Sequence, residues 1–404
     1  MTEIPKYSCL LPMHHMAIRP DGRVFPCCYF RHEYVPSDLN LSLEDPFNHP
    51  FMQNIRKSVL KDEMIPGCSK CYNDEKTSNN SMRTDIFRSP YNFLNLPTDG
   101  SKGKVPKLTN IDITFSNVCN NKCRMCGPEL STQWYSDAKK MGYPFEKRGI
   151  IYQNKWIETA DVSDLTFIKF LGGEPLMEQE KMIQLLQKCN RKNLIVHITT
   201  NGTLLPNTDL HKLLKECEGV YMTVSVDQFG DFNDFLRKGS EWATTLDNMF
   251  VFKERYGKGD TTLHSVTSIY NVNLCNQLIE FCLKHKFYQK NAIVDGPNWM
   301  MPRNLPPLVK EKLIDLLNKW IKQASKILQK LDYLYDGKAH YKNIISELEQ
   351  EGDFGMFLRN DTRLNIIRNE HWKDHNPYLW NELKPYFDDT QLEEGQLEYL
   401  HSLG

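Results

Sequence analysis

The chain has 404 residues, of which 25% are charged and 40% are apolar, a composition typical of a globular protein with more than one domain. A formal net charge of −1 argues against a general nucleic-acid or membrane-surface binder, and no apolar run reaches membrane-spanning length. The first residues lack the apolar core of a signal peptide. We therefore expect a cytoplasmic protein whose 12 cysteines are metal ligands or buried thiols rather than disulfides.

Residues 1–90 are loop-rich and cysteine-rich, and they form the first predicted domain. A Pro-Asp-Gly sequence at 20–22 lies between two apolar stretches and predicts a hairpin, with Gly22 at the positive φ that the turn needs. The hairpin and a later C-x2-C pair present four thiols, which are Cys9, Cys27, Cys68 and Cys71. Four thiolates can close a site that suits either zinc or iron. Cys28 is a spare that can replace Cys27 as a ligand, although we expect it to be an unliganded neighbour.

Residues 91–107 contain Pro, Gly, Asn, Ser and Lys with little periodicity, so they are predicted to form a linker. From 108 to 304, apolar strand-like segments alternate with helical segments. The predicted strands are 111–115, 166–171, 194–199, 220–227, 263–270 and 292–294. The predicted helices lie near 129–141, 179–189, 209–217, 242–255 and 274–285. Six such units predict a parallel sheet with right-handed crossovers.

Chemical motifs follow these strands. Three cysteines at spacing C-x3-C-x2-C come directly after the first strand, at Cys119, Cys123 and Cys126. Three thiolates leave one iron of a [4Fe–4S] cube without a protein ligand, whereas a structural zinc site normally has four ligands. The second strand is followed by Gly-Gly-Glu-Pro at 172–175. The motifs fall at the carboxyl ends of strands, which is the edge where chemistry occurs in parallel α/β barrels.

The C-x3-C-x2-C motif, followed one βα unit later by Gly-Gly-Glu-Pro, resembles the radical S-adenosylmethionine (SAM) superfamily. The N-terminal cysteine pattern resembles the twitch domain, a shorter relative of the SPASM domain. The resemblance covers about Cys9–Asn304. It implies an α/β fold in which 108–304 form a partial (β/α)6 TIM-like barrel, preceded by a small Cys-rich domain that binds an auxiliary iron–sulfur cluster.

The resemblance also implies roles for the motif residues. Cys119, Cys123 and Cys126 would hold a [4Fe–4S] cluster whose open iron binds SAM. One electron would then cleave SAM to methionine and a 5′-deoxyadenosyl radical that abstracts hydrogen from a substrate. The implied SAM contacts are Gly172, Gly173, Glu174 and Pro175 to the amino group, Asn201, Ser225 and Asp227 to the ribose, and Arg237 to the carboxylate. For these last four residues, an ordinary strand-end cap or ion pair is the competing interpretation. The auxiliary cluster would lie on Cys9, Cys27, Cys68 and Cys71.

Residues 305–404 are predicted to form a helical extension that begins with a long amphipathic helix at 306–328 and covers the barrel or lines the substrate entrance.

From the family resemblance we expect an enzyme of oxidoreductase or transferase type that acts on a peptide or small metabolite. Its electron donor would be a protein such as flavodoxin or ferredoxin. Two alternatives remain open. One is a non-catalytic interaction protein with zinc in both cysteine groups, and the other is an RNA-modifying enzyme, against which the balanced charge counts.

Overall fold

The computed structural model describes residues 4–78, 81–88, 108–145, 153–256, 261–327, 337–388, 392 and 394–403, so the predicted linker at 91–107 lies outside the described residues. The chain forms two compact units. The first unit comprises Met1–Asn117, Arg148–Thr200 and Leu205–Met222, and the second comprises Val118–Lys147, Asn201–Leu204 and Thr223–Gly404. The domain boundaries that the sequence suggests remain a prediction.

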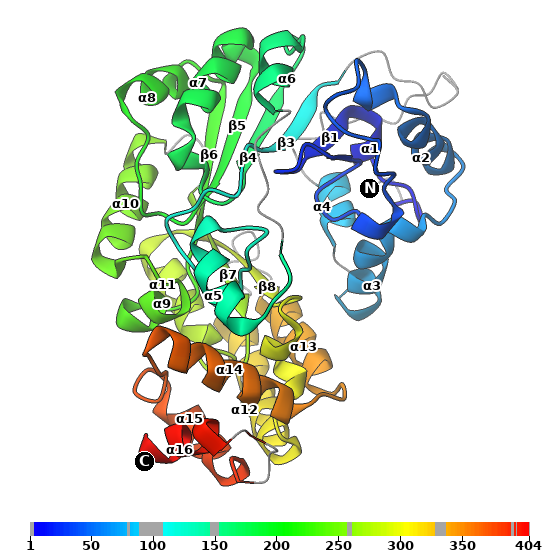
Figure 1. The fold of residues 1–404 in the computed structure, drawn as a ribbon. Helices are drawn as coiled ribbons and strands as arrows, with labels where there is room; N and C mark the ends of the chain where they lie inside the picture. Colours follow the sequence, from blue (N-terminus) through cyan, green and yellow to red (C-terminus); the bar gives the residue numbers. More distant parts are fainter. Residues whose placement is uncertain are drawn as a thin grey trace. The chain divides into compact units, whose positions relative to one another are not determined.

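Eight strands form one sheet in the order β2-β1-β3-β4-β5-β6-β7-β8 (Figure 1). They are β1 (His15–Ile18), β2 (Val24–Phe25), β3 (Asn110–Thr114), β4 (Phe167–Leu171), β5 (Ile195–Thr200), β6 (Gly219–Ser225), β7 (Thr261–Thr267) and β8 (Tyr288–Ile293). The pairs β3–β4, β4–β5 and β7–β8 are parallel. The six strands predicted for the barrel correspond to β3–β8, and the sheet is open, with β2 and β8 at its edges. The predicted α/β fold with a partial barrel is confirmed.

In the first unit, the predicted N-terminal hairpin forms and extends the sheet. β1 pairs antiparallel with β2, and Gly22 in the connection has a φ of 79°. The other edge of β1 pairs in parallel with β3, with His15 opposite Asn110. All four residues of β1 are buried, as expected for a strand with neighbours on both sides. The cysteine-rich region therefore contributes a strand to the sheet, which its sequence does not predict.

The first unit also contains α1 (Leu11–His14), α2 (Pro50–Leu60), α3 (Ser69–Ser78), α4 (Met82–Arg88), α6 (Gln153–Thr159), α7 (Gln179–Lys188) and α8 (Thr208–Lys215). Residues 69–88 are more helical than the sequence predicts. The sequence of α3, SKCYNDEKTS, is predominantly polar, so it lacks the apolar period that reveals a packed helix. α2 has that period and was predictable, and it buries Met52, Ile55 and Val59.

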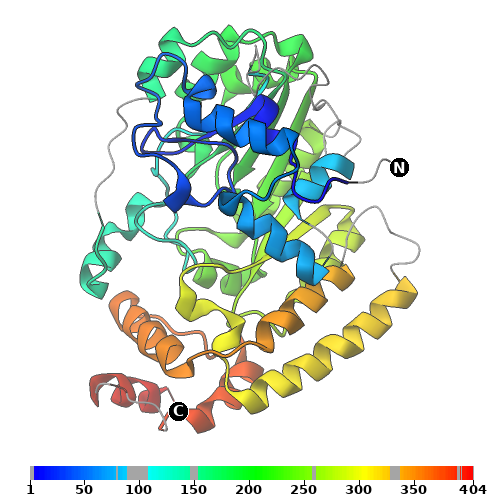
Figure 2. The same ribbon diagram turned by 90° about the vertical axis from the view of Figure 1, so that its right-hand side faces the viewer.

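The second unit contains α5 (Tyr135–Met141), α9 (Gly230–Leu236), α10 (Trp242–Arg255), α11 (Cys275–His285), α12 (Pro307–Ile327), α13 (Gly337–Leu348), α14 (Phe354–Arg368), α15 (Pro377–Leu383) and α16 (Glu394–Ser402). The C-terminal extension is helical, as predicted, and α13 packs along α12 (Figure 2). Its aromatic residues Phe357, Trp372 and Trp380 are buried in the main hydrophobic core of this unit. No helix in the described parts of the chain has the length and apolar character needed to cross a membrane.

Candidate functional site

The C-x3-C-x2-C loop of the second unit brings its three thiols together. Cys119 and Cys123 are buried, and Cys126 is half-buried. The backbone N–H of Cys126 donates to the carbonyl of Cys123 at 3.1 Å, which closes the turn between them. A hydrogen bond from Cys126, opposed by burial and assisted by the positive charge of Arg237, lowers the pKa of Cys123 to about 7. The same hydrogen bond and burial raise the pKa of Cys126, and the charge of Cys119 adds to this shift, so Cys126 interacts with both other thiols.

Nitrogen donors surround two of these sulfur atoms. The backbone N–H of Asn121 lies 3.4 Å from Sγ of Cys119, and Nδ2 of Asn201 lies 3.9 Å from the same atom. Nη1 of Arg237 lies 3.9 Å from Sγ of Cys123. Donors and positive charge beside thiolates stabilise their anionic form and tune the potential of an iron–sulfur cluster bound to them. The loop therefore fits a cluster with three cysteine ligands.

Arg237 and Asp227 form a buried ion pair beside the loop, with Nε and Oδ2 2.8 Å apart. The other carboxylate oxygen of Asp227 accepts from the backbone N–H of Val266 at 2.8 Å. Both side chains thus have protein partners, and their proposed contacts to the ribose and carboxylate of SAM remain predictions. Ser225 is half-buried at the end of β6.

Asn201 also has partners within the second unit. Its Nδ2 donates to Oδ1 of Asn120 at 2.8 Å, and its Oδ1 accepts from the backbone N–H of Thr203 at 3.0 Å. The side chain therefore ties the turn after β5 to the cysteine loop. Its proposed contact to the ribose remains a prediction.

The Gly-Gly-Glu-Pro motif lies in the first unit and forms the turn after β4. Gly172 has a φ of 146°, and the N–H of Gly173 donates to the carbonyl of Ser116 at 3.2 Å. Glu174 is buried, and its Oε1 accepts from the N–H of Leu176 at 3.0 Å and from Oγ1 of Thr200 at 2.8 Å. Glu174 therefore caps the short 3-10 helix η5 (Pro175–Met177), which Pro175 begins. The contacts of the motif with SAM remain predictions.

Gly172→Ala is expected to destabilise the protein by about 1–3 kcal/mol, because its φ is essentially reserved for glycine. A Cβ would also approach the carbonyl oxygen of Ser116 to 3.1 Å. Urea denaturation measures the effect. Gly395→Ala on α16 is the control, since a Cβ there meets nothing within 4 Å. Equal midpoints for the two variants would contradict the assigned conformation.

The four N-terminal cysteines of the first unit lie near one another. Cys27 packs against the small buried cluster that contains Cys9. Burial and then the charges of Cys68 and Cys71 raise the pKa of Cys9 to about 12, whereas a backbone hydrogen bond and Arg83 lower it. Burial and then the charges of Cys28, Cys9 and Cys68 raise the pKa of Cys27. Thiols that are buried and mutually repelling become thiolates when a metal supplies compensating positive charge. These residues therefore fit a second metal centre.

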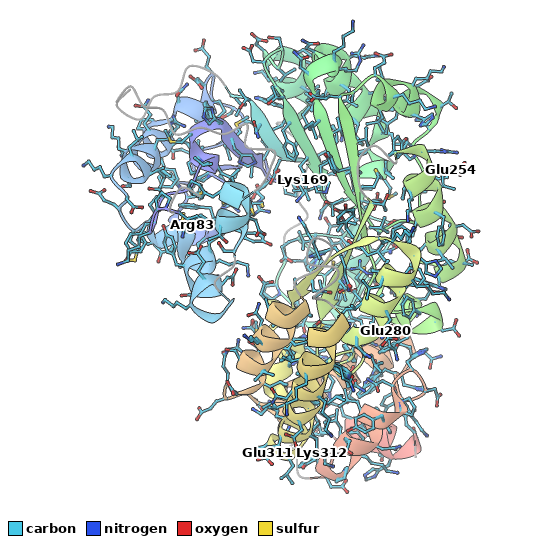
Figure 3. All side chains as sticks on the ribbon, turned by 180° about the vertical axis from the view of Figure 1, so that it is seen from behind. Arg83, Lys169, Glu254, Glu280, Glu311 and Lys312 are labelled. Atoms are coloured by element: carbon cyan, nitrogen blue, oxygen red, sulfur yellow. The ribbon has the colours of Figure 1, made fainter. Side chains whose placement is uncertain are left out.

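Cys28 has different surroundings from Cys27. Burial and then Asp112 of β3 raise the pKa of Cys28 to about 12, and Lys169 of β4 lowers it. Its Sγ also lies 3.8 Å from Sδ of Met82. Figure 3 labels Lys169 on β4 and Arg83 on α4. These contacts favour the prediction that Cys28 is an unliganded neighbour.

Among the described residues, no group of three or more His, Cys, Asp or Glu side chains has the arrangement of a single-ion site. An iron–sulfur cluster places each thiolate on a different iron, so its ligands need not meet at one point. A cavity of about 420 Å³ lies elsewhere in the second unit, where Leu308, Lys312 and Glu382 are among its lining residues. Lys312 and Glu311 are labelled in Figure 3. None of the predicted site residues lines this cavity.

Sequence reasoning missed Arg124, which lies within the C-x2-C segment and is completely buried. Its guanidinium contacts Asp361 and Glu370, both of which lie far along the chain. A charged residue in a cysteine loop gives no sign of such partners in a single sequence.

Comparison with known proteins identifies two families. Residues 113–281 match the radical SAM superfamily, and residues 9–72 match an iron–sulfur cluster-binding domain of the SPASM type. The first match contains the three loop cysteines and the Gly-Gly-Glu-Pro motif. The second contains the four N-terminal cysteines and Cys28. Both resemblances stated from the sequence are confirmed.

The individual proteins that resemble this chain have low sequence identity to it, between 18% and 27%. An uncharacterized protein of Methanocaldococcus jannaschii is 27% identical over 159 residues, and the match covers 39% of this chain and 46% of the relative. The chain thus aligns with about half the length of that relative. Among solved structures, anSMEcpe with bound AdoMet has a TM-score of 0.39 at 19% identity, over 54% of this chain and 61% of that one. Streptococcus suis SuiB bound to S-adenosylmethionine has a TM-score of 0.39 at 18% identity, over 70% and 56%.

Proposed function

Because residues 113–281 match the radical SAM superfamily and residues 9–72 match an iron–sulfur cluster-binding domain, we propose that the protein reductively cleaves SAM and uses the product radical to abstract hydrogen from a substrate. The observation that carries the proposal is the convergence of Cys119, Cys123 and Cys126 in one loop, with the guanidinium of Arg237 3.9 Å from the middle thiol. Three ligands leave the fourth iron of a [4Fe–4S] cluster open to SAM.

When bound, the cluster and SAM supply the electron and the radical chemistry, while the protein supplies binding, orientation and exclusion of water. The three cysteines hold the cluster. Arg237 places a permanent positive charge beside the thiolates, and Asp227 fixes its guanidinium. The two glycines at 172–173 expose backbone to which the SAM amino group can bind, and the buried carboxylate of Glu174 holds that turn in place.

Product analysis tests this function. Protein reconstituted anaerobically with iron and sulfide, and reduced with dithionite, is expected to convert SAM to methionine and 5′-deoxyadenosine. A colourless protein that binds zinc and leaves SAM intact would support the competing interpretation, a zinc-stabilised interaction protein.

A peptide or small metabolite is the proposed substrate class, and flavodoxin or ferredoxin is the proposed electron donor. The iron–sulfur cluster-binding domain favours a peptide, since the twitch resemblance points to peptide oxidation or to sulfur–carbon and carbon–carbon linkage. Mass spectrometry of candidate peptides after incubation with the reduced enzyme tests this assignment. The expected product is a peptide that has lost hydrogen or gained an internal sulfur–carbon or carbon–carbon bond. A modified RNA, found after the same incubation with RNA, would support the RNA-modifying alternative.

Cys27→Ala is expected to lower the iron and sulfide content by the amount of the auxiliary cluster, because Cys27 lies with Cys9 and Cys68. SAM cleavage by the core cluster is expected to persist at least in part. Cys28→Ala is the matched control, and it is expected to retain both clusters because its thiol faces Asp112 and Lys169. Loss of iron in Cys28→Ala but not in Cys27→Ala would mean that Cys28, and not Cys27, is the cluster ligand.

A further inference from the structure

Arg124 ties the cysteine loop to the C-terminal extension. It stands between Cys123 and Cys126, and its side chain is 0% exposed. Nη1 donates to Oη of Tyr270 at 3.0 Å and to Oδ1 of Asp361 at 3.2 Å. The guanidinium also lies over the ring of Phe235, 4.0 Å from its centroid, which is a favourable cation–π distance.

The other end of the guanidinium reaches further acceptors of the extension. Nη2 donates to Oδ1 of Asn365 and to Oε1 of Glu370, the latter at 2.8 Å. The backbone of the same loop residue is also fixed, since the N–H of Arg124 donates to the carbonyl of Leu236 at 2.8 Å. The loop residue is thus held through both its main chain and its side chain.

The acceptors on α14 are themselves held in place. Oδ1 of Asp361 accepts from Oη of Tyr270 at 2.5 Å, and Oδ2 accepts from Nε1 of Trp372 at 3.0 Å and from Nδ2 of Asn365 at 3.0 Å. Asp361 is completely buried, so its charge is tolerated only because these donors and Arg124 surround it. Removing one member of such a buried network leaves an uncompensated charge.

A second buried connection joins the same elements. Asp137 of α5 accepts from Nζ of Lys122, 3.1 Å away, and from Nε of Arg368 at the end of α14, 2.8 Å away. The Arg368 guanidinium lies 4.7 Å from the ring centroid of Trp134, and Nε1 of Trp134 donates to the carbonyl of Cys123 at 2.8 Å. α14 packs directly on α5 (Figure 1). Lys122 and Cys123 are therefore connected to α14 through Asp137 and Trp134, next to the direct contacts that Arg124 makes with the same helix.

We propose that Arg124 is a positioning residue and that α14, with the turn that follows it, is a brace that holds the cysteine loop in its cluster-binding conformation. The inference rests on the proposed function, because it assumes that the loop binds a cluster. It gives the C-terminal extension a role in the metal centre, beyond covering the barrel. Groups that orient metal ligands typically contribute roughly 10–100-fold to metal affinity, so loss of the brace is expected to weaken cluster retention.

Asp361→Asn tests the brace, because it changes a residue on α14 and leaves the cysteine loop sequence intact. In reconstituted full-length protein, we expect iron release to an added chelator to accelerate by roughly 10–100-fold. The electron paramagnetic resonance (EPR) signal of the reduced core cluster should broaden. Arg359→Met on the same helix is the matched control, because its ion pair with Asp353 is exposed and faces away from the network. Arg124→Lys should give an intermediate release rate, since an ammonium retains the charge without the fork.

The outcomes separate the brace from general stabilisation and from the proposed function. Wild-type iron retention and an unchanged EPR signal in Asp361→Asn, together with a lower melting temperature, would overturn the inference. Should Asp361→Asn fail to fold, Glu370→Gln at the edge of the network decides by the same measurements. If wild-type protein binds no iron in the cysteine loop, both the proposed function and this inference are wrong. If the wild-type loop binds iron, and Asp361→Asn and Arg359→Met both release it as slowly as wild type, the brace is overturned and the proposed function is not.

Discussion

Replacing Cys119, Cys123 and Cys126 together by alanine is expected to remove about four irons per chain and to abolish SAM cleavage under dithionite. The three thiols lie in one loop of the second unit, and no other cysteine group described here leaves an open iron. The auxiliary cluster of the first unit should remain, so the variant is expected to stay coloured. Iron, sulfide and 5′-deoxyadenosine analyses on the same sample measure the effect.

A second triple variant controls for the loss of buried thiols in general. Cys189, Cys275 and Cys282 are buried on α11 or at the end of α7, and burial raises the pKa of each thiol to about 12. Replacing them by alanine should leave iron content and SAM cleavage near wild-type values. SAM cleavage that survives in the Cys119/Cys123/Cys126 variant would refute the assignment of the core site.

Arg237→Met is expected to cost about 3–5 kcal/mol of stability, because it leaves the carboxylate of Asp227 buried without its cation. It also removes the positive charge that lies 3.9 Å from Sγ of Cys123. A cluster on that thiolate should become harder to reduce, since its potential depends on nearby charge and hydrogen bonds. Urea denaturation and a redox titration followed by EPR measure the two effects separately.

The double variant Arg237→Met/Asp227→Asn distinguishes the two roles of Arg237. An amide at 227 can still accept from the N–H of Val266 and carries no charge, so most of the lost stability should return. The potential should return only in part: the second substitution removes a negative charge that also acts on Cys123, but the positive charge 3.9 Å from its Sγ is still absent. Arg359→Met, which removes only an exposed ion pair, should cost about 1 kcal/mol or less. Recovery of both properties in the double variant would show that Arg237 acts only as the partner of Asp227.

The parts of the fold that could be predicted are those with a strong local pattern. β3–β7 were located to within a few residues because apolar residues cluster or alternate along them. β8 begins earlier than the prediction, because its first residues, YQKN, are largely polar and only Gln289 among them is buried. The pairing of β1 with β3 joins segments about 95 residues apart along the chain, and a single sequence does not record such a contact.

The candidate site also has features that the sequence predicts and features that it does not. Cysteine spacing predicted both groups of thiols, because each contains a C-x2-C pair of the kind that places two ligands on one turn. The acidic partners of Arg124, Asp361 on α14 and Glu370 just after it, lie 237 and 246 positions away, in a segment whose sequence carries no catalytic motif. The family resemblance suggested Asp227 and Arg237 as SAM contacts, which remains a prediction. It did not suggest them as partners of each other, since their pairing depends on how α9 returns to the end of β6.

EPR spectroscopy of the dithionite-reduced, reconstituted protein, with and without SAM, tests the central claim most directly. The proposed function predicts two reduced cluster signals, of which one changes its g values when SAM is added, because only the cluster on Cys119, Cys123 and Cys126 has an iron without a protein ligand. The signal of the auxiliary cluster should stay unchanged. Two signals whose g values both stay unchanged when SAM is added would contradict the account. So would a protein that binds zinc and gives no cluster signal.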